Sequence, residues 1–437
     1  MGTVGGRAET VGELLGRCLR AGGVGRVFGG AVAGVPRVET PDARLSALLA
    51  DCDGRLGPGP GCALGPDGQS LRLSSRPGAG AEPVAVTSAD DIPAAIAAAA
   101  APARAGSAAT ELRLELDLAA PAPAGAQPVD LAPPSPAREP LEPPDGPVVA
   151  LVGPGVVRAG AVDGLRAFAA AGNLGVANTW GAKGVFPWDS PHHMGTAGLQ
   201  ERDFELLGFG DAGMIVAAGI DTDEASPDRF ALAPVLAVAP HHLGADLAQR
   251  IRPATRPSSP NQLYERIAAV AQPGFVAEKV PLHPARAVAD VRAALPPNGV
   301  VAGEPGLTGL WVARTFPTTE PSSVVVPATR ASGVAAGLAL VAALRGHPAV
   351  AVISDPVDEA TGSVVGLAAR LGAAFVLDIW SLYGGLTHVE DHRARLDAAF
   401  AAPGVTEVRV PVDASDVRFL AEAAGAVVAW GGLAAAP

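Results

Sequence analysis

The sequence predicts an α/β protein with three Rossmann-like, parallel-sheet domains, and two observations carry this prediction. Short apolar strands alternate with Gly-rich turns and amphipathic helices, which is the pattern of βαβ units. The chain has 437 residues, which at about 150 residues per domain gives roughly three domains. Hydrophobic residues make up 49% of the chain and charged residues only 17%, so each domain can bury a core.

The first domain is expected over residues 1–118. The spacing of its apolar residues predicts helices that alternate with short strands. The expected helices are residues 9–21, 42–53 and 92–103, and the expected strands are residues 24–28 and 111–118. Residues 54–80 are rich in Gly and Pro, which predicts an irregular segment.

A linker is expected over residues 119–147, because this stretch is dominated by Pro and Ala and has no core-forming pattern. The central domain is expected over residues 148–255. Its predicted elements are a strand at 148–152, a turn at 153–155, a helix at 162–171 and a strand at 214–218.

The last domain is expected over residues 256–437, after a boundary that three prolines mark near residues 252–260. Helical spacing is present at 262–271 and 284–295. Strands are predicted at 299–302, 323–326, 349–353 and 374–377, with helices between them. The last third of the chain therefore repeats the α/β pattern.

Composition excludes several classes of partner. The formal net charge of -12 argues against nucleic acid and against an anionic membrane surface. The N-terminus lacks a basic segment followed by an apolar run, so no signal peptide is expected. The apolar stretches are too short and too rich in Ala and Gly for membrane spans. Cys18, Cys52 and Cys62 lack metal-ligand spacing and are interpreted as reduced thiols of a cytoplasmic protein.

Several segments carry a family resemblance. Gly153–Gly160, Asn178–Gly184 and Phe209–Asp221 resemble the central domain of thiamine diphosphate (ThDP) enzymes of the acetolactate synthase type. Further segments follow in the order of that family's diphosphate-binding domain: Leu282-His283-Pro284, Trp311–Arg314, Ser332-Gly333, residues 351–356, Tyr383-Gly384 and Ala401–Val412. Residues 10–29 and 92–118 look like its pyrimidine-binding domain. The resemblance implies the order pyrimidine-binding, central and diphosphate-binding domain.

The resemblance implies a catalytic carboxylate that contacts the cofactor's pyrimidine ring. Asp42 falls near the family's glutamate position, and Glu39 is the alternative. An aspartate is one methylene shorter, and a misplacement of about 1 Å can cost on the order of 100-fold in rate. The alternative interpretation makes Asp42 the N-cap of a helix after Pro41.

The resemblance also implies a Mg²⁺ ion that bridges the protein and the diphosphate. Asp355 stands where the family has the aspartate of Gly-Asp-Gly, but Ser354 and Pro356 replace both glycines. Proline has no N–H to offer a phosphate. The second metal ligand falls just before Tyr383, where Ser381 is the candidate and Leu382 cannot ligate. The alternative interpretation makes Asp355 a strand-end turn residue.

Five residues are implied to contact the cofactor: Ser332, Gly333, Ser354, Tyr383 and Gly384. Ser332 stands where the family has a bulky methionine beneath the thiazolium ring. Two family segments are shortened, one between Gly57 and Pro83 and one after Tyr383. The central domain of this family sometimes holds FAD or an adenine nucleotide, for which Gly153-x-Gly155 is a weak signal.

Histidines offer other metal candidates. The pairs His192-His193 and His241-His242 are adjacent, and adjacent side chains on an extended segment point apart. His388 and His392 could meet on one face of a helix, within a polar cluster that also holds Glu390 and Asp391. The alternative interpretation of this cluster is a solvated helix start.

Two functions follow from this comparison. The favoured prediction is a cofactor-impaired protein that acts as a non-catalytic structural or regulatory partner. The alternative is an active decarboxylase or carboligase that uses ThDP and Mg²⁺ on a small 2-oxo acid. Because the family's sites form between two subunits, we expect a homodimer or a hetero-oligomer with an active paralogue.

Overall fold

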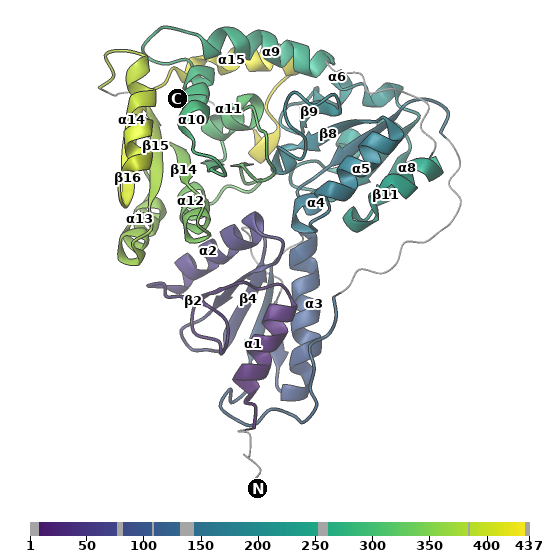
Figure 1. Ribbon diagram of the computed structural model, residues 1–437, viewed down its shortest axis with the longest axis vertical. Helices are drawn as coiled ribbons and strands as arrows, with labels where there is room; N and C mark the ends of the chain where they lie inside the picture. Colours follow the sequence, from purple (N-terminus) through teal and green to yellow (C-terminus); the bar gives the residue numbers. More distant parts are fainter. Residues whose placement is uncertain are drawn as a thin grey trace. The chain divides into compact units, whose positions relative to one another are not determined.

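The computed structural model describes residues 8–76, 82–106, 109–131, 144–251, 261–382 and 385–432 (Figure 1). The chain divides into two compact units, and the division falls between Pro134 and Ser135. Three sheets built mostly of parallel strands, with helices packed on them, confirm the predicted α/β class. Unit 1 holds the first sheet, and unit 2 holds the other two.

The sheet of unit 1 has six strands in the order β2-β1-β3-β4-β6-β5. These strands are β1 (Val27–Gly29), β2 (Arg37–Val38), β3 (Gly61–Leu64), β4 (Ser70–Ser74), β5 (Val84–Val86) and β6 (Thr110–Leu114). The helices are α1 (Val11–Ala21), α2 (Ala43–Leu56) and α3 (Ile92–Ala105). The apolar face of α1 packs into a core that is made entirely of unit 1 residues.

The prediction of an irregular segment over residues 54–80 was wrong. Strands β3 and β4 lie there and pair antiparallel, and β4 also runs antiparallel to β6. Asp67 stabilises the turn between β3 and β4. Its side chain accepts hydrogen bonds from the backbone amides of Gln69 and Ser70 at 3.0 and 3.3 Å. Gly68 in the same turn has a φ of 71°, a backbone conformation that favours glycine. The Gly and Pro content marked this turn but concealed two short buried strands.

The central sheet of unit 2 is fully parallel, with the order β11-β10-β7-β8-β9. Its strands are β7 (Val148–Val152), β8 (Gly175–Thr179), β9 (His193–Ala197), β10 (Met214–Ala218) and β11 (Val235–Val238). Its helices are α4 (Gly155–Arg158), α5 (Val162–Gly172), α6 (Asp203–Leu206), α7 (Pro227–Phe230) and α8 (Ala245–Ile251). Strands β7 and β10 begin and end where the apolar runs of the sequence predicted.

The third sheet is also parallel, with the order β13-β12-β14-β15-β16. Its strands are β12 (Val300–Gly303), β13 (Val324–Val325), β14 (Ala349–Ser354), β15 (Phe375–Ser381) and β16 (Val405–Pro411). The helices are α9 (Gln262–Phe275), α10 (Pro284–Ala294), α11 (Leu307–Thr315), α12 (Val334–Leu344), α13 (Glu359–Leu371), α14 (Glu390–Ala401) and α15 (Val417–Ala424). One apolar core runs through both sheets of unit 2.

Strand β15 extends past the predicted end at residue 377. Its additional residues include Asp378 and Trp380, which are both buried. Asp378 is fully buried, and the Trp380 indole donates to its carboxylate at 3.1 Å. A charged residue in an apolar run predicts a strand end, but here buried partners satisfy the charge. Within the described ranges, no helix is long and apolar enough to cross a bilayer.

Candidate functional site

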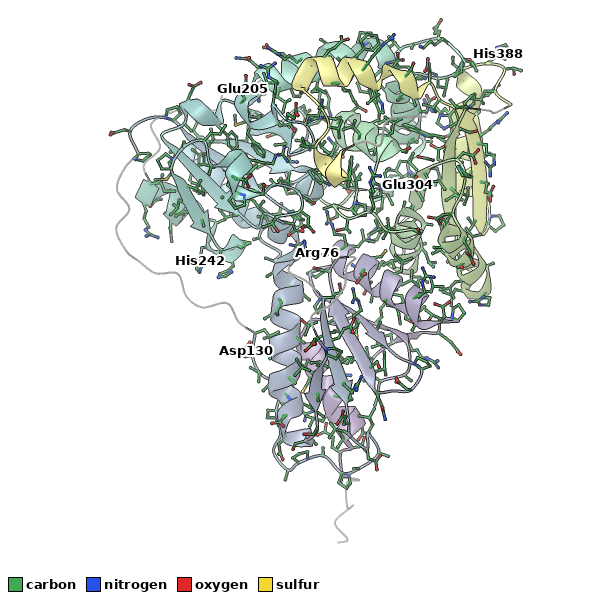
Figure 2. All side chains as sticks on the ribbon, turned by 180° about the vertical axis from the view of Figure 1, so that it is seen from behind. Arg76, Asp130, Glu205, His242, Glu304 and His388 are labelled. Atoms are coloured by element: carbon green, nitrogen blue, oxygen red, sulfur yellow. The ribbon has the colours of Figure 1, made fainter. Side chains whose placement is uncertain are left out.

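The carboxyl ends of β12, β14 and β15 bring the predicted diphosphate-site residues together. Ser354 ends β14, and its amide donates to a Glu304 carboxylate oxygen at 2.7 Å. Its hydroxyl lies 2.8 Å from the hydroxyl of Thr308 at the start of α11. Strands of a parallel sheet end at one edge, so this is where an α/β fold places a ligand. Figure 2 shows Glu304 in this part of unit 2.

Asp355 is bonded through both of its carboxylate oxygens. Arg409 of β16 donates to Oδ1 at 2.7 Å, and Ser381 donates to Oδ2 at 3.3 Å. The structure thus brings the two candidate metal ligands, Asp355 and Ser381, next to each other. It also pairs the Arg409 guanidinium with the Asp355 carboxylate, which a metal ion would need as a ligand.

Gly333 lies at the start of α12, where its amide donates to Asp358 Oδ2 at 2.9 Å. The other carboxylate oxygen of Asp358 caps α13 through the amide of Thr361 at 2.6 Å. Gly333 has a φ of 74°, and a Cβ there would lie 2.9 Å from the carbonyl carbon of Ala360. Close packing against α13 therefore explains this glycine without a ligand. Ser332 is exposed.

Two further predicted contacts, Tyr383 and Gly384, lie outside the described residues.

The electrostatics of this edge oppose a magnesium diphosphate. Burial raises the pKa of the Glu304 carboxyl, and the charge of Asp358 adds to that shift. The amides of Ser354 and Gly333, which a phosphate would need, are already bonded to carboxylates. Among the described residues, no three His, Cys, Asp or Glu side chains gather to hold a metal ion. The residues present do not fit the cofactor unless these bonds break.

The candidate catalytic carboxylates lie in unit 1. Asp42 is the N-cap of α2, and its Oδ1 accepts the amide of Leu45 at 2.8 Å. Its contacts therefore match the N-cap interpretation. Glu39 is exposed, and its carboxylate lies 3.6 Å from the Arg37 guanidinium. Both side chains face solvent in unit 1.

The close approach of Gly153 and Gly155 to β10 explains the Gly-x-Gly pattern of the central domain. A Cβ at Gly153 would lie 2.4 Å from the Gly219 carbonyl oxygen, and one at Gly155 would lie 2.7 Å from the Gly219 Cα. These glycines are required for backbone packing between the turn after β7 and the end of β10. A separate cavity of about 540 Å³ lies beside Gly219 and is lined mainly by β10, β11 and α7. The predicted flavin or adenine nucleotide stays a prediction.

His241 and His242 contradict the expectation for adjacent histidines. They lie in the 3-10 helix η4 (Pro240–His242), and their ring centroids are 4.1 Å apart. The extended segment assumed for the pair is absent here. In the other pair, His193 is buried at the start of β9, and His192 Nδ1 lies 2.8 Å from the Leu174 carbonyl.

His392 was predicted to lie on a solvated helix start or to pair with His388, and both interpretations are wrong. Its ring is fully buried and lies between two carboxylates, 3.2 Å from Asp290 and 3.2 Å from Asp378. Burial alone lowers the pKa of His392, but the two carboxylates outweigh burial and raise that pKa to about 9. His388, by contrast, is exposed (Figure 2).

The Asp290–His392–Asp378 network continues at both ends. The Arg286 guanidinium donates to Asp290 at 2.9 Å, and Trp380 donates to Asp378. Every charged member is therefore paired inside the interface of α10, α14 and β15. None of these residues lines the 380 Å³ or the 540 Å³ cavity, and the network joins three elements of the fold.

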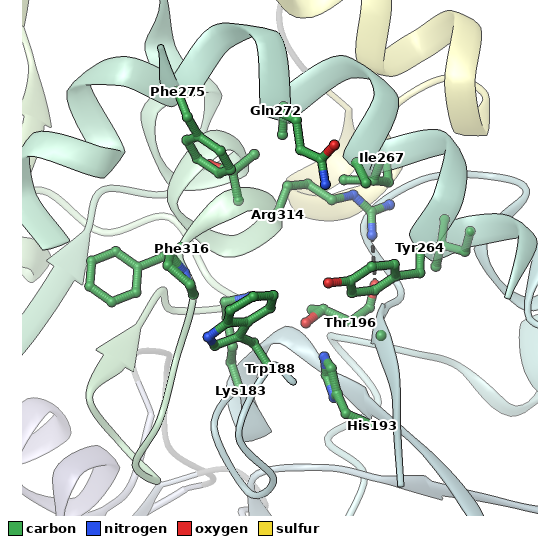
Figure 3. Close-up of a pocket in the computed structure, with 16 residues that line it drawn as sticks. Lys183, Trp188, His193, Thr196, Tyr264, Ile267, Gln272, Phe275, Arg314 and Phe316 are labelled. Carbon is green, nitrogen blue, oxygen red and sulfur yellow. Dashed lines mark hydrogen bonds between the residues drawn. The ribbon is translucent and has the colours of Figure 1, made fainter. Parts of the chain in front are cut away.

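A second candidate site is a cavity of about 380 Å³ within unit 2 (Figure 3). It lies between the β9 edge of the central sheet and helices α9 and α11. Its polar lining residues are Lys183, His193, Thr196, Tyr264, Gln272, Arg314 and Thr315, and its aromatic residues are Trp188, Phe275 and Phe316. The resemblance to ThDP enzymes did not point to this cavity.

Arg314 holds one wall of the cavity in place. Its guanidinium donates to the Thr196 carbonyl at 2.6 Å and to the Gln200 side chain at 3.0 Å, and it also pairs with the buried Asp203. Figure 3 shows the bond from Arg314 to Thr196. Since these donors bind acceptors of the central domain, Arg314 links α11 to the central sheet.

Comparison with known proteins supports the fold. Residues 146–247 match the family model of the thiamine pyrophosphate enzyme central domain. A Mycobacterium smegmatis structure, described as a thiamin diphosphate-dependent enzyme, has a TM-score of 0.64 at 18% identity, covering 93% of this chain and 100% of that chain. No curated protein sequence matches the chain.

Two further solved structures are decarboxylases. The ThDP-dependent 4-hydroxybenzoylformate decarboxylase of Rhodococcus jostii RHA1 has a TM-score of 0.64 at 16% identity, covering 92% of this chain and 99% of that chain. Benzoylformate decarboxylase from Polynucleobacter necessarius has a TM-score of 0.62 at 14% identity, and the match covers 93% of this chain and 99% of that chain. The chain thus has the fold of ThDP-dependent enzymes. More particularly, residues 146–247 match the model of their central domain.

Sequence reasoning missed the partners that occupy the predicted site. Arg409 and Asp358 carried no motif, because each acts through a contact that only the fold creates. Lys183, which lines the 380 Å³ cavity, could have been noticed in the sequence by its rarity. It is one of only two lysines, with Lys279, among 32 basic residues that are otherwise arginine.

Proposed function

We propose that this chain is a cofactor-impaired relative of acetolactate synthase-type enzymes that acts as a non-catalytic structural or regulatory partner. The observation that carries this proposal is the pairing of Asp355 with Arg409 and Ser381. A carboxylate that neutralises a guanidinium is a poor ligand for Mg²⁺, which needs several hard oxygens. The bond from the Gly333 amide to Asp358 adds support, since it removes a phosphate donor.

The alternative function is an active ThDP- and Mg²⁺-dependent decarboxylase or carboligase of a 2-oxo acid. The match of residues 146–247 and the decarboxylases among the similar folds favour it. The position of Asp355 beside Ser381 at the carboxyl ends of two parallel strands also favours it. In this alternative, Asp355 and Ser381 would hold the metal after Arg409 moves away.

The proposed partner is an active paralogue with intact metal ligands, bound as a hetero-oligomer, and the runner-up is a homodimer. The proposed compartment is the cytoplasm, because Cys18, Cys52 and Cys62 are all buried and none of them is in a disulfide. Burial raises the pKa of the Cys62 thiol, so this thiol is protonated and inert at neutral pH. FAD or an adenine nucleotide in the central domain remains a separate proposal.

Affinity purification of the tagged full-length chain from its native cell tests the partner role. We expect a second ThDP-fold chain to be recovered in stoichiometric amount. Recovery of the homo-oligomer alone would contradict a partner role. Release of CO₂ from pyruvate or benzoylformate by the purified protein, with ThDP and Mg²⁺ added, would contradict the non-catalytic role and support the alternative.

A further inference from the structure

Lys183 is a buried amine that has no counter-ion among the described residues. It follows the 3-10 helix η2 (Trp180–Ala182), lines the 380 Å³ cavity and is only 5% exposed. Within the described stretches of the chain, its side chain makes no hydrogen bond and no ion pair. A buried ammonium with no partner is costly, so the neutral amine is the favoured form.

The charges around Lys183 favour the same form. Burial lowers the pKa of Lys183 to about 7, and the positive charge of Arg314 on α11 contributes. His193 on β9 is neutral at pH 7, since burial and the charge of Lys183 lower its pKa to about 3. Tyr264 on α9 stays neutral, because burial raises its pKa. A desolvated lysine beside a second cation is the arrangement that activates an amine as a nucleophile.

The walls of the cavity define what can reach this amine. Trp188, Tyr264, Phe275 and Phe316 surround the space, and Leu263 and Ile267 of α9 add aliphatic surface. Trp188 is 44% exposed, so it borders solvent. Such a lining suits an uncharged molecule with an apolar body.

A β-bulge shapes the floor of the cavity. The pairing of β8 with β9 shifts between Val176 and Ala177, so that His193 and Gly195 are paired and Met194 is extra. Gly195 has a φ of 129°, which suits glycine, and it exposes backbone to the cavity. The bulge thereby places His193 and Thr196 on the cavity wall.

We propose that Lys183 captures an apolar aldehyde or ketone in this cavity as an imine. The proposal goes beyond the non-catalytic partner role and does not depend on ThDP. The site would let a chain without cofactor chemistry sense a reactive carbonyl compound.

The step balances without an oxidant or a reductant. The lone pair of the Lys183 amine attacks the carbonyl carbon, which forms a C–N bond and a carbinolamine. The C–O bond then breaks, and the oxygen leaves as water with the two protons that the amine has lost. Figure 3 shows the Tyr264 hydroxyl pointing into the cavity, where it can supply a proton to the leaving oxygen and regain one from the nitrogen.

Reductive trapping tests the proposal on the full-length protein. The protein is incubated with benzaldehyde and cyanoborohydride, which reduces an imine to a stable amine, and each lysine is quantified by peptide mass spectrometry. Lys279 is the matched control, since it is half-exposed and pairs with Asp413 and Asp416 at 3.7 and 3.4 Å. At pH 7 the neutral fraction of Lys183 exceeds that of an ordinary lysine by about 1000-fold. We expect at least ~10-fold more label on Lys183 than on Lys279.

The pH profile and two variants complete the test. Label on Lys183 should reach half of its maximum near pH 7, whereas label on Lys279 should still rise above pH 9. Lys183→Met should lose the label and Lys279→Met should keep it. If Lys183→Met does not fold, the wild-type ratio of the two lysines decides. Equal labelling of both lysines at pH 7, or a Lys183 profile that rises only above pH 9, would overturn the proposal.

A chemical series tests the apolar class. Benzaldehyde should label Lys183 faster than acetaldehyde does, and Phe316→Ala should reduce that preference several-fold because the aromatic wall is lost. A preference for acetaldehyde in the wild-type protein would contradict a ligand with an apolar body.

Discussion

At the scale of single residues, buried charges in this chain are satisfied by partners that lie far away in the sequence. His392 and Asp378 are both fully buried, and Asp290 lies 102 residues before His392. Removal of one member of such a network leaves an unpaired buried charge, which typically costs about 3–5 kcal/mol. We therefore expect the loss of any one member to destabilise the protein strongly.

The first prediction concerns the pH dependence of this network. The folded-state pKa of His392 is about 9, above its ordinary value of 6.5, so the folded protein binds the extra proton. The stabilisation is thus fully present below pH 6.5 and is lost as the pH rises through about 9. On the order of 3 kcal/mol of the unfolding free energy should disappear over this range. Urea unfolding from pH 6 to pH 10 measures it.

The control is His388→Gln, which changes an exposed histidine on the neighbouring segment and should leave the profile unchanged. His392→Phe should flatten the profile and destabilise the protein at pH 7. An unchanged unfolding free energy between pH 6.5 and pH 9 in the wild-type protein would refute this account of His392.

At the scale of elements, turns are fixed by close backbone contacts as much as by side chains. The turn after β7 passes so near the end of β10 that Gly153 and Gly219 must both lack a side chain. The same motif in sequence is a weak signal for a phosphate site. Packing alone accounts for it here.

The second prediction compares two glycines of the central sheet region. Gly153→Ala would place a Cβ 2.4 Å from the Gly219 carbonyl oxygen, so strand ends must separate, at a cost of about 1–3 kcal/mol. Gly244→Ala meets no atom within 4 Å and should be nearly neutral. Thermal unfolding of both variants measures the difference. Equal stability of the two variants would contradict the packing explanation.

The sequence predicted elements well where apolar runs were uninterrupted, as in β7 and β10. It failed where a strand was short and flanked by turn residues, as in β3 and β4, and where a charge was buried, as at Asp378 in β15. The candidate metal residue Asp355 could be found by its motif. Its partner Arg409, 54 residues later, could not, because only the pairing of β14, β15 and β16 brings the two together.

At the scale of the whole molecule, each unit has a hydrophobic core of its own. The core of unit 1 uses residues from Val11 to Leu131, and the cores of unit 2 use residues from Val148 onward. A separate core is the physical requirement for independent folding.

The third prediction is that residues 144–437 fold without unit 1. We expect this fragment to be monodisperse and to unfold in a single cooperative transition by circular dichroism. Aggregation of the fragment, or a non-cooperative melt, would show that unit 2 depends on unit 1 for its fold.

The central claim is that the ThDP-enzyme fold is retained here while the metal and diphosphate contacts have been replaced by contacts within the protein. Calorimetric titration of the full-length chain with ThDP in the presence of Mg²⁺ tests this claim most directly. The account predicts no binding heat at micromolar cofactor, because Arg409 and Ser381 hold Asp355 and because Asp358 holds the Gly333 amide. Micromolar binding that Asp355→Asn abolishes would contradict it.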